Sequence, residues 1–155
     1  MVKSDPWKDI ESECIKANGC ETGGILIGYY TDERTTAVVT EATAPPKDSS
    51  YGRNWFRRGV AGLKALLVGR WNSLGQRTFY IGEWHFHPSV NVEPSKDDYK
   101  QMRDISNSLN YHCNEPIMLI FGQDVGDNRP ARAFVFPRGK RPYEYHRLST
   151  TKNQA

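Results

Sequence analysis

Cysteine is scarce in this 155-residue sequence, which contains only Cys14, Cys20 and Cys113. An odd number of cysteines cannot all pair within one chain, and no Cys-x-x-Cys motif occurs. A fully paired disulfide framework is therefore excluded. No apolar run typical of a signal peptide opens the printed sequence. We therefore expect a protein of the reducing cytoplasm.

Long apolar runs and a strong charge imbalance are also missing. No stretch approaches the roughly 18 apolar residues that a membrane span needs. The formal net charge is only +3, and the one dense basic run, residues 138–141, is best interpreted as a solvated turn. Nucleic-acid-binding proteins usually concentrate their charge in a patch or stripe. We expect neither nucleic acid nor a membrane among the partners.

The composition is sufficient for one globular domain, with 37% hydrophobic and 12% aromatic residues. The patterns predict an α/β (α+β) fold in which a sheet is flanked by about three helices, over residues 1–148. Residues 149–155 are expected to form a flexible tail. The expected helices span 5–18, 60–75 and 95–109, and the expected strands span 23–30, 35–43, 78–87, 116–122, 131–136 and 143–148.

Local signals set some of these boundaries. Asp5 and Pro6 predict a helix start, with Asp5 as the N-cap. In the last helix, Tyr99, Met102, Ile105 and Leu109 are expected to point inward. The segment 44–58 has no strong periodicity and is expected to be irregular, as functional segments often are.

The first chemical signal is the pair His85 and His87 at the end of an expected strand. Side chains alternate along a strand, so both imidazoles project to one side while Phe86 faces the core. Two imidazoles on one face can bind one zinc ion. Pro88 ends the strand because it cannot donate a hydrogen bond. Taken alone, a His-x-His pair would still favour a structural explanation.

A carboxylate follows at the start of the next helix, where seven residues separate His87 from Ser95. Ser95 is the expected N-cap and Asp98 is the third residue of the helix. This arrangement alone is most simply a capping motif. Beside His85 and His87, however, Asp98 becomes a candidate third ligand. Two histidines, one carboxylate and water form the open pattern of a catalytic zinc site.

A metal-activated water also requires a proton acceptor, and the candidate is Glu21. It lies directly before an apolar strand, where Gly23 and Gly24 would allow close backbone approach beside the carboxylate. The simpler interpretation is that Glu21 is only a polar residue at a strand end.

Together these residues resemble the JAB1/MPN metallopeptidases, also called JAMM. The shared signature is a glutamate before a glycine-bearing strand, His-x-His-Pro, and Ser-x-x-Asp after seven further positions. The resemblance covers roughly residues 6–148 and implies a mixed sheet with one Zn2+ per chain. It also implies metal ligation by His85, His87 and Asp98, acid–base catalysis by Glu21, and oxyanion stabilisation by Ser95.

Residues 82–85, Gly-Glu-Trp-His, resemble bacterial members of the family in particular. Compact members of this type occur in antiphage operons of the CBASS type, beside E1- and E2-like enzymes. The resemblance thus implies an isopeptidase acting after the C-terminal glycine of a ubiquitin-like protein or its conjugates. Processing of a ubiquitin-like or sulfur-carrier precursor would use the same site and stays open. Two functions of other classes compete with these, a metal-free MPN scaffold and a RadC-like DNA-associated protein.

The groove for such a substrate is expected between the segment 44–58 and the loop 89–94. Arg53, Arg57 and Arg58 are candidates to meet acidic or carbonyl groups on the modifier, although solvent-facing charges are the simpler interpretation. His112 and Cys113 have no second pair of metal ligands nearby in the sequence. Cys113 is therefore expected to be a buried thiol.

Overall fold

The computed structural model describes residues 1–145, so the expected tail and the end of the last expected strand lie outside the described residues. Within this range the chain forms three α-helices, eight strands and one short 3-10 turn, Leu109–Tyr111. The helices are α1 (Ser4–Lys16), α2 (Leu63–Trp71) and α3 (Lys96–Asn107). The strands are β1 (Thr22–Tyr30), β2 (Ala37–Ala42), β3 (Ser50–Tyr51), β4 (Phe56–Arg57), β5 (Phe79–Phe86), β6 (Ile117–Phe121), β7 (Ala131–Val135) and β8 (Tyr143–Tyr145).

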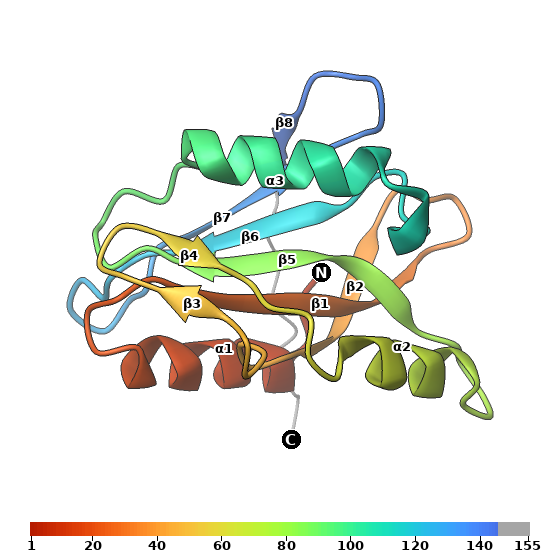
Figure 1. Cartoon of the computed structure of the whole chain (residues 1–155), viewed down its shortest axis with the longest axis horizontal. Coiled ribbons are helices and arrows are strands. Elements are labelled where there is room, and N and C mark those ends of the chain that lie inside the picture. Colours follow the sequence, from red (N-terminus) through yellow and green to blue (C-terminus); the bar gives the residue numbers. More distant parts are fainter. Residues whose placement is uncertain (146–155) are drawn as a thin grey trace.

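Six of these strands build one mixed sheet in the order β2-β1-β5-β6-β7-β8 (Figure 1). Strands β5 and β6 are parallel, and the other neighbouring pairs are antiparallel. The expected hairpin of the first two strands is confirmed as β1 and β2. The sheet and the three helices confirm the expected α+β fold of one mixed sheet flanked by helices.

Both faces of the sheet are covered. Helix α1 packs Ile10 and Cys14 against one face, where they join Trp84 and Phe86 in a buried cluster. On the other face, α3 contributes Met102 to a second cluster, against which leucines of α2 pack. The prediction that Phe86 faces the core is confirmed. The side of β5 that carries His85 therefore faces away from α1.

Strand β5 contains a bulge that decides which residues share this face. Leu26 pairs with Gly82 and the next residue, Ile27, pairs with Tyr80, so Ile81 is an extra residue in the ladder. A Cβ at Gly82 would lie 1.9 Å from the Ile117 carbonyl oxygen, so only glycine allows β6 to approach. The bulge brings Tyr80 and Glu83 to one side, where their side chains hydrogen-bond.

Several expected boundaries are wrong. Helix α1 starts at Ser4, with Lys3 as its N-cap, so Asp5 and Pro6 lie inside the first turn. A proline is tolerated there because the first backbone N–H groups of a helix have no intrahelical partner. Helix α2 starts at Leu63 rather than Val60, because Gly62 with a φ of 79° precedes it.

The expected inward face of the last helix is half correct. Met102 and Ile105 are buried, but Tyr99 is 39% exposed and Leu109 is 74% exposed. The α-helix ends at Asn107, and Leu109 begins the 3-10 turn, which changes its direction. The segment 44–58 is not wholly irregular either, because β3 and β4 pair within it as a short hairpin. Strands of two residues are too short to leave a periodic pattern.

Candidate active site

The two histidines lie at the C-terminal end of β5, which is a central strand of the sheet. His85 is 1% exposed inside the strand, and His87 follows directly after the strand at 8% exposure. Among the described residues, the Nε2 atoms of both rings are buried and have no hydrogen-bond partner. Buried polar atoms are nearly always satisfied, so two orphaned imidazole nitrogens indicate a missing ligand.

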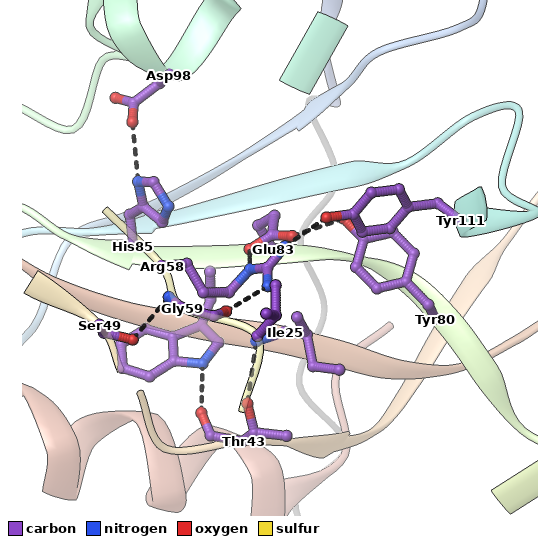
Figure 2. Close-up of polar contacts among 12 residues, drawn as sticks. Ile25, Thr43, Ser49, Arg58, Gly59, Tyr80, Glu83, His85, Asp98 and Tyr111 are labelled. Atoms are coloured by element: carbon purple, nitrogen blue, oxygen red, sulfur yellow. Dashed lines mark hydrogen bonds and ion pairs between the residues drawn. The ribbon is translucent and has the colours of Figure 1, made fainter. Parts of the chain in front are cut away.

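Asp98 lies beside both histidines because α3 starts above the end of β5. Its Oδ1 atom is 2.8 Å from His85 Nδ1 (Figure 2), and its Oδ2 atom is 3.4 Å from His87 Nε2. Burial raises the pKa of Asp98, but the hydrogen bond with His85 and the close contact with His87 outweigh it and hold the pKa well below its usual range. The carboxylate is therefore ionised, the form that binds a metal.

The helix cap holds this carboxylate in place. Ser95 Oγ accepts a hydrogen bond from Asp98 N at 3.1 Å, and Ser95 N donates to Asp98 Oδ2 at 2.7 Å. This is the expected capping box, so Ser95 as N-cap is confirmed. Asp98 is thus both a member of the helix cap and a candidate metal ligand. Because Ser95 Oγ acts here as an acceptor, its hydroxyl hydrogen stays available for a second partner.

The three candidate ligands fit a single metal ion. One ligand atom from each of His85, His87 and Asp98 lies within 4.8 Å of the others, and all three residues are buried. Two imidazoles and one carboxylate leave a coordination position open, as in catalytic rather than structural zinc sites. The donor set and the orphaned nitrogens both fit one bound cation.

Glu21 lies in the same cleft, immediately before β1. Burial and the nearby Asp98 raise the pKa of Glu21, while the two histidines act in the opposite direction and only partly compensate. A Cβ at Gly23 would lie 2.8 Å from His85 Cδ2 and from Phe56 Cε1, so the close approach expected of this glycine is confirmed. A carboxylate whose pKa is raised is a stronger proton acceptor than an ordinary carboxylate.

Glu21, His87 and Ser95 line an open cleft of about 350 Å3, and His85 and Asp98 are buried behind them. One wall carries Arg53 and Asn54, from the turn between β3 and β4, and the other wall is the loop after His87. The walls coincide with the two segments expected from the sequence. The lining residues are Glu21, Arg53, Asn54, His87, Pro88, Ser89, Asn91, Glu93, Pro94 and Ser95.

The arginines of the first wall differ in position. Arg53 and Arg57 are exposed, but the Arg58 side chain is only 3% exposed and pairs with Glu83. Both interpretations of Arg58, a contact to the modifier and a solvent-facing charge, are therefore wrong, because its guanidinium is enclosed. The sequence patterns also did not single out Phe56, whose ring lies edge-on to the His85 ring at 5.3 Å. Phe56 and Arg58 are two positions apart, a spacing that places both side chains on one side of an extended segment. This spacing was the signal in the sequence that both could face β5.

No cysteine lines the cleft, and Cys14 and Cys113 lie in the two hydrophobic clusters. Cys14 and Cys113 are buried, and Cys20 is partly exposed. Burial raises the pKa of the Cys14 thiol to about 12, and it also raises the pKa of Cys113. A thiolate is the nucleophilic form of cysteine, so these two buried thiols are unsuited to catalysis. The prediction of a buried thiol at Cys113 is confirmed.

The fold and the site together define a JAB-type domain. Residues 11–136 match the family model described as prokaryotic homologs of the JAB domain. The chain belongs to this family, as the resemblance in the sequence implied.

Two curated relatives carry the name CD-NTase/cGAS isopeptidase. The protein from Enterobacter hormaechei subsp. hoffmannii (strain UCI 50) is 45% identical over 142 residues, covering 92% of this chain and 77% of the relative. The protein from Pseudomonas aeruginosa (strain BWHPSA011 / Pa011) is 32% identical over 87 residues, covering 56% of this chain and 54% of the relative. These names support a hydrolase of the isopeptidase class.

A solved structure supports the fold independently. The solution structure of protein DSY2949 from Desulfitobacterium hafniense superposes with a TM-score of 0.70, covering 99% of this chain and 94% of that one. Its sequence identity is 16%, so the likeness concerns the fold alone. Among residues 1–145, no helix is long and apolar enough to cross a membrane.

Proposed function

We propose that this chain is a zinc-dependent isopeptidase that cleaves the amide bond after the C-terminal glycine of a ubiquitin-like protein. The observation that carries the proposal is the buried set of His85, His87 and Asp98, with Glu21 in the same cleft. The isopeptidase relatives support the reaction class. The choice of zinc rests on the donor set, because imidazole and carboxylate ligands with an open position suit catalytic zinc.

In this proposal, His85, His87 and Asp98 hold the ion, and Ser95 fixes the Asp98 carboxylate through its backbone N–H. A zinc ion held there supplies Lewis acidity, which lowers the pKa of water and polarises a carbonyl.

The remaining steps belong to side chains of the cleft. Glu21 takes a proton from the attacking water and delivers it to the leaving amine, for which its raised pKa is suitable. The Ser95 hydroxyl donates its free hydrogen to the oxyanion that develops on the scissile carbonyl. Each role requires only a residue that already lines the cleft.

The cleft also suggests the form of the substrate. An extended chain terminus can enter the cleft between the turn of β3 and β4 and the loop after His87, and glycines, which lack side chains, can pass closest to the buried ligands. Because the relatives are named for CD-NTase/cGAS, we propose that a conjugated enzyme of that type is released. We place the activity in antiphage defence of the CBASS type, with E1- and E2-like proteins as operon partners.

The test uses a ubiquitin-like protein fused through its terminal glycine to a reporter. We expect cleavage at that bond by the zinc-loaded protein, and loss of cleavage after chelation. A matched fusion with the glycine replaced by a large residue should resist. Equal cleavage of both fusions, or cleavage of unstructured peptides at many sites, would show a general peptidase. Absence of both bound zinc and cleavage would instead favour the metal-free scaffold.

A further inference from the structure

A buried ion pair lies outside the cleft, two residues before His85. Arg58 Nε is 2.6 Å from Glu83 Oε2, and the two side chains are 3% and 0% exposed. Glu83 also accepts a hydrogen bond from Tyr80 at 2.8 Å, and Arg58 donates to Tyr111 at 2.8 Å (Figure 2). Every charged group of the pair is thus hydrogen-bonded, as burial of charges requires.

Such a pair is a poor way to gain stability. Removing two charges from water is costly, and apolar side chains of similar size often stabilise a protein as well or better. What a fully bonded ion pair does supply is geometry, because the planar guanidinium donates in fixed directions.

The pair joins the β3–β4 hairpin (residues 50–57) to the strand that carries the histidines. Phe56 contacts His85, and Arg58 contacts Glu83, so two alternate residues of one segment meet two alternate residues of β5. Strands β3 and β4 lie across β1 and β5 in Figure 1. The later residue of the hairpin segment, Arg58, meets the earlier residue of β5, Glu83, so the two segments run antiparallel. Two such contacts fix the position of the hairpin on β5.

The far end of the hairpin reaches the candidate base. Gly52 O accepts a hydrogen bond from the backbone N–H of Glu21 at 2.8 Å, and the next two residues, Arg53 and Asn54, line the cleft. At the near end, Arg58 Nη1 donates to Gly59 O, and Gly59 N donates to Ser49 Oγ. The hairpin is thus held at its base by Arg58 and at its turn by Glu21.

We infer that Arg58 and Glu83 form a positioning pair, which sets the cleft wall formed by residues 52–54 relative to Glu21 and the histidines. Neither side chain touches the cleft, and both act through the hairpin. The kinetic part of this inference rests on the proposed function, whereas the structural part does not.

The test compares a neutral variant with a matched surface pair. In Arg58→Met/Glu83→Gln, the amide of Glu83→Gln still accepts from Tyr80, and no buried charge is left unpaired. The control is Arg70→Met/Glu41→Gln, since Arg70 and Glu41 form an arginine–glutamate pair with two hydrogen bonds, at 2.6 and 3.0 Å, that is partly exposed and joins α2 to β2. Both variants are measured by amide hydrogen exchange and by zinc content.

We expect amide exchange at residues 50–57 to accelerate about tenfold or more in Arg58→Met/Glu83→Gln, while amides of α3 and β6 keep their protection. Zinc content should stay at the wild-type level. With the glycine-linked fusion, kcat/KM should fall about tenfold, with most of the loss in KM, because the wall is displaced and the ligands are not. The control variant should match the wild type in all measurements.

Arg58→Lys supplies a second measurement that does not depend on the double variant folding. Lysine keeps the charge but not the planar fork, so we expect an intermediate acceleration of hairpin exchange and partial recovery of KM. Hairpin exchange equal to the wild type in both variants would overturn the inference, as would a uniform loss of protection over the whole domain. If the wild type cleaved no fusion, the proposed function would be refuted. The hydrogen-exchange result would then decide by itself whether Arg58 and Glu83 position the hairpin.

Discussion

At the scale of single residues, the site separates groups that would bind a metal from a group that would move a proton. His85, His87 and Asp98 are all less than one-tenth exposed and pack against one another. Glu21 reaches the cleft from the residue before β1, and its backbone bonds to Gly52 rather than to any of the three. This separation allows the two roles to be tested by different substitutions.

Glu21→Gln should abolish turnover while the protein still binds zinc, and His85→Ala should lose both. The amide keeps the size of the side chain but cannot accept the proton, and acid–base catalysis typically contributes about 10²–10⁴-fold. Elemental analysis of metal content, measured beside the cleavage rate, checks both variants. Activity of Glu21→Gln within about tenfold of the wild type would remove Glu21 from the mechanism. Stoichiometric zinc in His85→Ala would refute the ligand assignment.

At the scale of elements, the start of α3 has two functions. Its capping box satisfies free backbone groups of the helix and also orients Asp98 toward the histidines. In the sequence, capping and metal ligation were competing interpretations of Ser-x-x-Asp. In the structure, they are compatible, because Asp98 uses both carboxylate oxygens and a backbone bond at the same time.

Two substitutions at Ser95 separate its structural and chemical roles. Ser95→Ala should cost about 1 kcal/mol of stability through loss of the cap, while Ser95→Gly should cost only a few tenths. Both remove the hydroxyl, so both should lower kcat by roughly the same factor, on the order of 10²–10³ for one oxyanion donor. Thermal unfolding and steady-state kinetics provide the comparison. If activity followed stability, with Ser95→Gly close to the wild type, the hydroxyl would have no catalytic role.

At the scale of the whole molecule, the candidate site joins segments that are distant in the chain. The ligands come from β5 with its following residue and from α3, and Glu21 precedes β1. A bound ion would therefore connect the C-terminal end of β5 to the start of α3. The three ligands come together only in the folded chain, so metal binding should stabilise the fold.

Chelation should lower the melting temperature, and adding zinc back should restore it. At free zinc one hundred times Kd, binding contributes about 2.7 kcal/mol, which corresponds to roughly 5 to 10 °C for a domain of this size. Calorimetry of metal-free and zinc-loaded protein measures the shift, with His85→Ala as the control that should not respond. The same shift in His85→Ala would mean that zinc binds elsewhere.

The sequence alone was sufficient for the elements with strong local signals. The strand before His87, the cap at Ser95 and the buried Phe86 were predicted because alternation, proline and capping chemistry act over a few neighbouring residues. The candidate ligands were found in the same way, since His-x-His and Ser-x-x-Asp are local patterns. Their combination with Glu21 was recognised through the resemblance to a family.

Only the tertiary structure decided how distant segments meet. The bulge at Ile81, which turns Tyr80 and Glu83 to one face, depends on pairing with β1, and the neighbouring Gly82 alone does not specify its register. The burial of Arg58 against Glu83 follows from how the hairpin lies on the sheet. An arginine in a polar segment is expected to be solvent-exposed until a partner is known, and that partner is 25 residues away. Local chemistry therefore determined the candidate ligands, and long-range packing determined what holds the cleft around them.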